Sequence, residues 1–148
     1  MAQKTRTQNL TELLKELEAT TPDVEASAVV SIDGLIIASA LPQDVEEDRV
    51  AAMSAAMLSL VERKSQELKR VSHEQVFVKG VSGYILMMGA GQEAVLTALA
   101  RKDAKLGLVF LDMKRTADEI SKIIWFHFYN TFLIIFNIFY DYPMIFFI

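Results

Sequence analysis

The sequence predicts an α/β protein of the α+β type, in which helices flank a five-stranded antiparallel sheet in the order α-β-β-α-β-β-β-α. Three observations predict it. Apolar residues recur with helical spacing near the start of the chain, in its middle and after Leu106. An Asp-Gly pair separates two β-branched runs, and glycine-rich spacers separate three further apolar runs. Connections this short join antiparallel neighbours.

Composition limits the classes of function. The 148 residues are about enough for one domain, and 52% hydrophobic with 23% charged residues excludes intrinsic disorder. The chain has no cysteine, so disulfides, thiol nucleophiles and thiolate metal sites are excluded. A net charge of -4 argues against a nucleic-acid partner. The opening residues are polar and do not resemble a secretory signal, so we expect a cytoplasmic protein.

The first third of the chain predicts a helix followed by a hairpin. Leucines form one helical stripe at positions 10, 13, 14 and 17, where Asn9 and Glu12 fit a capping box and 20–22 ends the helix. Val29–Ile32 and Leu35–Ile37 then flank Asp33-Gly34, a pair typical of a type I′ hairpin turn.

The middle of the chain predicts a long helix that ends near Leu68. Asp44 and Glu47 fit a second capping box, and the acidic residues there suit the positive end of a helix dipole. One row of the helix is apolar and a second row is small. The apolar row is Val50, Met53, Met57, Leu60 and Val61, and the small row is Ala51, Ala55 and Ser59 with Ala52 and Ala56 beside it. Small residues let another backbone approach closely, although alanine also simply favours helix.

Three strands and a last helix follow. The runs 75–79, 84–88 and 94–100 predict a meander, because only short glycine-rich spacers separate them. From Leu106 the spacing of apolar residues becomes helical again. A monomer would leave the strand 75–79 as an open sheet edge with only Lys79 to guard it, so we expect a second copy to cover it.

No group of residues predicts a reaction. His73 and His127 are far apart in unlike contexts, and neither Ser31 nor Ser82 stands in a nucleophile motif. We therefore expect no enzyme activity, no metal and no cofactor.

The last 24 residues differ sharply from the rest. Eleven of the 14 aromatic residues lie between Trp125 and Ile148, and all 15 Lys and Arg precede Trp125. We therefore divide the chain into a domain over 1–124 and a tail over 125–148. Three interpretations of the tail stay open: a membrane segment over 123–140, a non-native extension from a frameshift or read-through, and a segment folded back on the domain.

Four segments together resemble the Roadblock/dynein light chain domain family, of the prokaryotic MglB-like type, over about residues 8–124. They are the hairpin VVSIDGLIIAS, the helix RVAAMSAAMLSLVERKSQEL, the meander QVFVKGVSGYILMMGAG and the helix LGLVFLDMKRTADEI. The resemblance implies a Roadblock fold related to profilin-like and longin-like domains. It also implies a homodimer, or a dimer with a related Roadblock subunit, that binds a Ras-like small GTPase as regulator or scaffold.

The same resemblance implies where the contacts lie. It assigns the pairing of helices to Ala51, Ala52, Ala55, Ala56 and Ser59. It assigns the joining of strands to Gln75, Val76, Phe77, Val78 and Lys79. A charged rim is assigned to Arg49 and Arg63.

Two other functions stay open. A small-molecule sensor of profilin-like or PAS-like architecture needs convergent polar groups in an apolar pocket, and the strands offer only Thr97 and Tyr84. A structural adaptor subunit would differ from a regulator only in leaving GTP hydrolysis unchanged.

Overall fold

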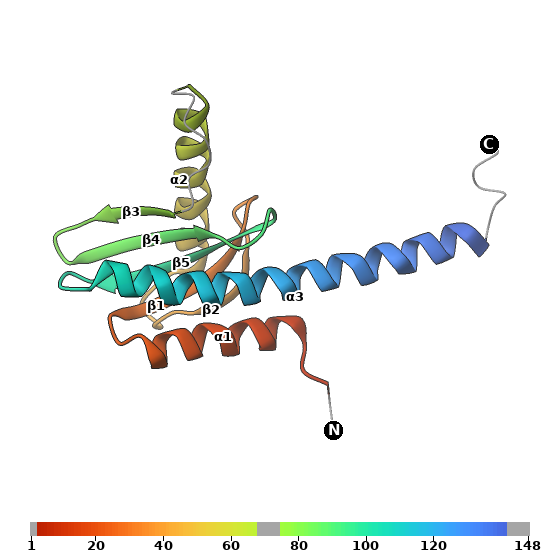
Figure 1. Cartoon of the computed structure of the whole chain (residues 1–148), viewed down its shortest axis with the longest axis horizontal. Coiled ribbons are helices and arrows are strands. Elements are labelled where there is room, and N and C mark those ends of the chain that lie inside the picture. Colours follow the sequence, from red (N-terminus) through yellow and green to blue (C-terminus); the bar gives the residue numbers. More distant parts are fainter. Residues whose placement is uncertain (1–2, 68–74, 142–148) are drawn as a thin grey trace.

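The computed structural model describes residues 3–67 and 75–141, with the side chains of all of these except 61–67 and 139–141. Its elements follow the predicted order. They are α1 (Arg6–Thr20), β1 (Val24–Ser31), β2 (Ile36–Ala40), α2 (Glu47–Glu67), β3 (Gln75–Lys79), β4 (Gly83–Gly89), β5 (Ala94–Arg101) and α3 (Leu106–Asp141). The strands form one antiparallel sheet in the spatial order β2-β1-β5-β4-β3 (Figure 1). The predicted fold class is therefore confirmed.

Helices α1 and α3 lie side by side on one face of the sheet, whereas α2 stands on the opposite face (Figure 1). The main core lies under α1 and α3, where Leu10, Leu14, Leu86, Met113 and Ile120 are each fully buried. Each such side chain contributes roughly 1.5–3 kcal/mol through burial. This core fixes the sheet and leaves the other face for α2.

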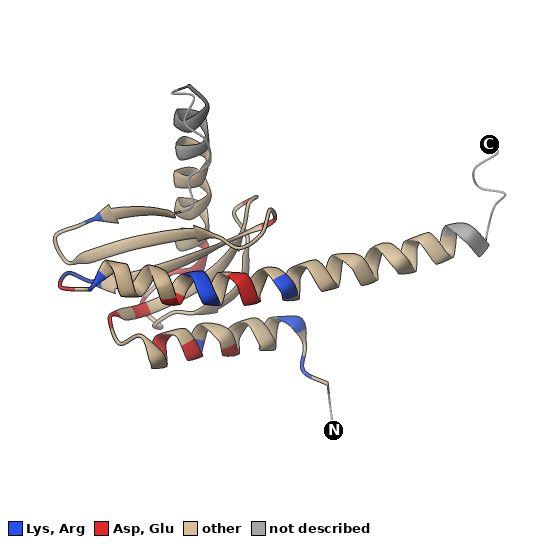
Figure 2. Ribbon diagram, viewed as in Figure 1, with Lys and Arg blue, Asp and Glu red and all other residues tan. Residues whose placement is uncertain are grey.

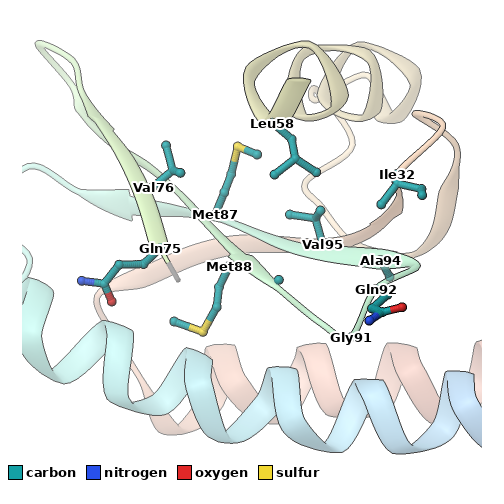
Figure 3. A pocket seen from close by; sticks show the side chains of 11 residues that line it. Ile32, Leu58, Gln75, Val76, Met87, Met88, Gly91, Gln92, Ala94 and Val95 are labelled. Carbon is teal, nitrogen blue, oxygen red and sulfur yellow. The ribbon is translucent and has the colours of Figure 1, made fainter. Parts of the chain in front are cut away.

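The α2 face carries a much smaller cluster. Its fully buried members are Ala28 and Val30 from β1 and Ala51 from α2. Strands β4 and β5 also present apolar side chains to this face, among them Met87 and Val95, which point toward α2 in Figure 3. The β4–β3 half of this face therefore has less helical cover than the opposite face.

Both predicted capping boxes are wrong. In α1 the cap is Thr5: its hydroxyl accepts from the Gln8 N–H at 3.2 Å, and the Gln8 side chain accepts from the Thr5 N–H at 2.8 Å. The helix therefore begins at Arg6, about a turn earlier than a cap at Asn9 would allow. Helix α2 begins at Glu47, which places Asp44 outside the cap position, and the Glu47 carboxylate accepts from the Ser39 hydroxyl.

The hairpin between β1 and β2 is confirmed, but its turn is not the predicted type I′. The Gly34 N–H donates to the Ser31 carbonyl at 3.0 Å, and the Ser31 N–H donates to the Leu35 carbonyl at 2.8 Å. This pattern fits a three-residue loop that ends on a left-handed glycine, and Gly34 has φ of +85°. The longer loop accompanies a register shift between Val29 and Val30.

Helix α3 does not end where the domain was expected to end. It runs without a break to Asp141, so residues 125–141 extend as helix beyond the sheet and beyond α1 (Figure 1). None of the helices in the described part of the chain is long and apolar enough to cross a membrane.

Candidate functional site

The first part of the site is the outer edge of β3. Within the described residues, β3 pairs on one side only, with β4, from Gln75 opposite Met88 to Lys79 opposite Tyr84. Phe77 and Val78 are 51% and 44% exposed. Such an edge presents backbone N–H and C=O groups that can pair with another strand.

Aromatic packing holds this edge strand on the domain. The ring of Phe77 lies 6.2 Å from that of Phe110 in α3 and 6.3 Å from that of Tyr84 in β4. The Lys79 ammonium lies 5.9 Å from the centre of the Tyr84 ring. Side-chain contacts with α3 and β4 therefore help to hold β3 in place as the edge of the sheet.

The second part of the site is the outer face of α2. The predicted small-residue row divides, because Ala51 is buried against the chain's own β1 and Ala55 is half-buried. A Cβ on Gly34 would lie 3.2 Å from the Ala55 Cβ, so the hairpin turn packs closely on the helix. Ala52, Ala56 and Ser59 point outward. The residues on α2 that remain accessible to a partner are thus only part of the predicted set.

Larger apolar side chains accompany the outward-facing small residues. Met53 and Leu60 are 49% and 56% exposed. Methionine adapts its shape to irregular apolar surfaces and is common where proteins bind one another. We use the term interaction surface for the β3 edge together with Ala52, Met53, Ala56, Ser59 and Leu60.

Two hollows lie between α2 and the sheet. The first, of about 300 Å³, is lined by Leu58 of α2 and by Val76, Met87 and Val95 of the strands (Figure 3). The second, of about 290 Å³, has a mixed lining: apolar side chains of α2 and the sheet, the hydroxyls of Ser54 and Thr97, and the charged residues Asp44, Glu46 and Arg49.

One buried polar pair lies in the second hollow and was not anticipated. The hydroxyls of Ser54 and Thr97 are 3.0 Å apart, and both residues are almost fully buried. In the sequence, Thr97 is an isolated polar residue in an apolar strand, and Ser54 follows the buried Ala51 by three positions. The helical spacing places Ser54 on the same face of α2 as Ala51, but the sequence does not show that it meets Thr97.

We expect Thr97→Val to lower the free energy of unfolding by about 1–3 kcal/mol, because it leaves the buried Ser54 hydroxyl without this partner. The double variant Ser54→Ala, Thr97→Val should cost less than the sum of the single variants. Urea denaturation of the four proteins measures this coupling. Additive effects would contradict a stabilising hydrogen bond between the two side chains.

The predicted rim is only partly described. Arg49 is exposed, and its guanidinium lies 3.7 Å from the Glu46 carboxylate. Arg63 belongs to α2, but its side chain lies outside the described residues, as does His73. His127 is exposed on α3. The Ser31 hydroxyl accepts from the Leu35 N–H at 3.1 Å, so it belongs to the hairpin turn.

Within the described residues, neither a metal-ligand cluster nor a carboxylate with a raised pKa lies on the interaction surface. Across residues 3–67 and 75–141, no cluster of three or more His, Asp or Glu side chains is placed to hold a metal ion. One described carboxylate with a shifted pKa is that of Glu18 in α1, on the opposite face of the sheet from α2. Burial raises the pKa of Glu18 above 4.5, and the hydrogen bond from the Ser27 hydroxyl, 2.7 Å away, partly opposes this shift.

The shift at Glu18 predicts a pH dependence of stability. The folded state holds this proton more tightly than the unfolded state, so stability falls as pH rises from 4.5 through the raised pKa. Glu18→Gln cannot titrate but still accepts from Ser27. Its melting temperature relative to wild type should therefore increase over this pH range. Glu16→Gln, exposed on the same helix, is the matched variant, and an identical pH profile for both variants would contradict the prediction.

Comparison with known proteins agrees with this architecture. The sequence pattern of the Roadblock/LC7 domain matches residues 10–100. The uncharacterized protein MJ0714 of Methanocaldococcus jannaschii is 42% identical over 101 residues, which cover 68% of this chain and 85% of that protein. The structure is similar to Myxococcus xanthus MglB, with a TM-score of 0.74, 22% identity and coverage of 84% and 92%. It is also similar to a Roadblock/LC7 domain from Streptomyces avermitilis, with a TM-score of 0.73, 21% identity and coverage of 78% and 97%. The chain therefore belongs to the Roadblock/LC7 domain family.

Proposed function

We propose that this protein is a non-catalytic, cytoplasmic dimer that binds a Ras-like small GTPase and regulates its activity or its location. One observation carries the proposal. The outer edge of β3 is open, and α2 covers the neighbouring β3–β4 half of its sheet face only in part. Family membership and the likeness to MglB structures support it.

The first step of the proposal is the dimer. Antiparallel pairing of β3 with β3 of a second copy satisfies both edges and makes one continuous sheet. The same twofold axis brings the outer faces of the two α2 helices together. There Ala52, Ala56 and Ser59 permit close approach of the helices. Pairing of this kind also covers the apolar hollow lined by Val76 and Leu58.

The second step is the GTPase. Two adjoining α2 helices make a composite platform that neither copy has alone, with the exposed Met53 and Leu60 as apolar contacts. Arg49 can form the charged edge of the platform. The contact is then protein to protein, and the nucleotide belongs to the GTPase.

Binding and turnover experiments test both steps. Ras-like GTPases of the source organism are loaded with GDP or a GTP analogue and titrated with the protein, and GTP hydrolysis is measured with and without it. We expect binding that depends on the nucleotide state. A change in hydrolysis identifies a regulator, and binding alone identifies a scaffold. Absence of binding to every such GTPase in both states would overturn the proposal.

A small-molecule sensor remains a second candidate because of the Ser54–Thr97 pair. It places two hydroxyls in a hollow of about 290 Å³ that also has apolar and charged lining residues. A thermal-shift screen with small apolar alcohols and acids tests this role. Stabilisation of wild type but not of Thr97→Val would favour the sensor.

A further inference from the structure

We propose that residues 125–138 of α3 form a second self-association site, in which the helical tails of two copies pack antiparallel. This site is separate from the β3 edge and from α2. It joins copies that the β3–α2 interface does not join.

The first argument is the continuity of an apolar stripe. In the first half of α3 the buried positions include Met113, Ala117, Ile120 and Ile124, at helical spacing. The same spacing continues beyond the domain with Phe128, Thr131, Ile135 and Ile138. Phe128, Ile135 and Ile138 are 59%, 46% and 55% exposed. The stripe that buries α3 on the domain thus continues into the part of the helix beyond α1. Figure 1 shows how far the helix itself extends there.

An aromatic ridge lies beside the stripe. Trp125 and Tyr129 stack with ring centres 5.3 Å apart, and Phe132 follows three residues later. Trp125 and Phe132 are each 65% exposed. The positions 125, 128, 132 and 135 have the alternating spacing of three and four residues that lets two helices pack along one seam.

The exposed area is large enough for a specific interface. Aromatic side chains bury roughly 150–250 Å² each, so half-exposed ones leave about 100 Å² each. Four such aromatic side chains and two smaller isoleucines on each tail supply on the order of 1,000 Å² in a pair, close to the lower limit for a specific interface. The six are Trp125, Phe128, Tyr129, Phe132, Ile135 and Ile138.

Charge favours a second copy over a membrane surface. Residues 123–138 include no Lys, Arg, Asp or Glu, and this part of α3 is tan in Figure 2. Two tails can therefore meet without like-charge repulsion. A helix that lies on a membrane usually carries Lys and Arg on its polar side, whereas here that side carries His127, Asn130 and Asn137.

The base of the tail favours the antiparallel direction. Trp125, Phe126 and Phe128 form a hollow of about 860 Å³ with the β4–β5 turn, which contributes Gly91 and Gln92. In an antiparallel pair centred near residue 131, Phe128 lies opposite Ile135 of the second copy. Ile138 of that copy then reaches this hollow. The same direction places the two domains at opposite ends of the paired tails.

The test compares the full chain with two variants that add the same charge on different sides of the tail. Phe132→Glu places a carboxylate in the seam, and Asn130→Glu places one on the polar side. In sedimentation equilibrium, wild type and Asn130→Glu should share one defined mass. Phe132→Glu should fall to half of it, with association weakened at least tenfold. Equal masses for all three proteins, equal loss in both variants, or unlimited aggregation of wild type would overturn the proposal.

Two further experiments test whether the paired tails run antiparallel and whether a second copy or a lipid surface covers them. The chain has no cysteine, so single cysteines report contacts cleanly. Under mild oxidation Thr131→Cys should form a disulfide dimer and Trp125→Cys should not, since only the centre of an antiparallel pair meets itself. Cross-linking at Trp125 would overturn the antiparallel arrangement. Wild type is also mixed with neutral or anionic lipid vesicles. Binding to the vesicles with loss of the tail-paired assembly would show that the tail binds lipid, and would overturn the proposed self-association site.

Discussion

Ala56→Glu, made in a Phe132→Glu background whose tails cannot pair, is expected to convert the remaining β3–α2 dimer to monomers at concentrations where Phe132→Glu alone is fully dimeric. The residue is exposed on α2, so the isolated domain tolerates glutamate there. In the proposed dimer the same carboxylate would be buried against its own copy across the twofold axis. Like charges so placed cost several kcal/mol. We expect a loss of affinity of at least a hundredfold, or about 2.7 kcal/mol, measured by sedimentation equilibrium.

Ala19→Glu provides the control for this experiment. Ala19 is exposed on α1, on the other side of the sheet, so the substitution makes the same change in charge and side chain away from the proposed interface. It should leave the association constant unchanged. Ala55→Glu is a less informative variant, because Ala55 lies against the Gly34 turn and a glutamate there would disturb the fold. Equal behaviour of Ala56→Glu and Ala19→Glu would contradict the assignment of the α2 face.

Gly83→Ala is expected to be strongly destabilising. A Cβ at this position would lie 2.3 Å from the carbonyl oxygen of Ala100, a backbone atom that a side-chain rotation cannot move. Gly83 is the first residue of β4 and pairs with Arg101 of β5. Relief of the clash must therefore shift the strands apart. We expect a loss of about 3 kcal/mol or more in the free energy of unfolding by urea.

The matched substitution is Gly107→Ala in the first turn of α3. No heavy atom lies within 4 Å of a Cβ built at Gly107, and its backbone is helical. Alanine there should raise stability by about 0.5 kcal/mol, since glycine loses more freedom on folding. A loss of stability in Gly83→Ala and a gain in Gly107→Ala would confirm that the close approach between β4 and β5 causes the destabilisation at Gly83. Similar losses in both variants would contradict it.

The sheet and the helices could be predicted because the sequence shows apolar residues at helical spacing and apolar strand runs separated by short glycine-rich spacers. The run 75–79 and the glycine spacers around 84–88 identify the meander directly, and β3 and β4 follow them within one residue at each end. The leucines of α1 identified its buried face, since Leu10, Leu14 and Leu17 are the buried residues of that helix. These features depend on local pattern alone.

The choice of cap and the division of the α2 surface could not be predicted, because two local cap patterns compete and the division depends on tertiary contacts. Thr5 with Gln8 and Asn9 with Glu12 both fit a capping box by residue type, and the structure has the first. Ala51 and Ala52 are identical in sequence terms, yet the first is buried on β1 and the second is exposed. Which alanine faces the sheet follows from where β1 crosses beneath the helix.

The pairing of α1 with α3 has a consequence for how the domain folds. The Thr21 hydroxyl donates to the Asp112 carboxylate at 2.9 Å, across 91 positions of the chain. The leucines of α1 therefore obtain their full cover only after the last helix has been synthesised. Cooperative folding should accordingly wait for release of nearly the whole polypeptide, and chain separation of this order slows the search for the native arrangement. Amide protection in α1 and in the first half of α3 should then be lost together, as a single unfolding unit.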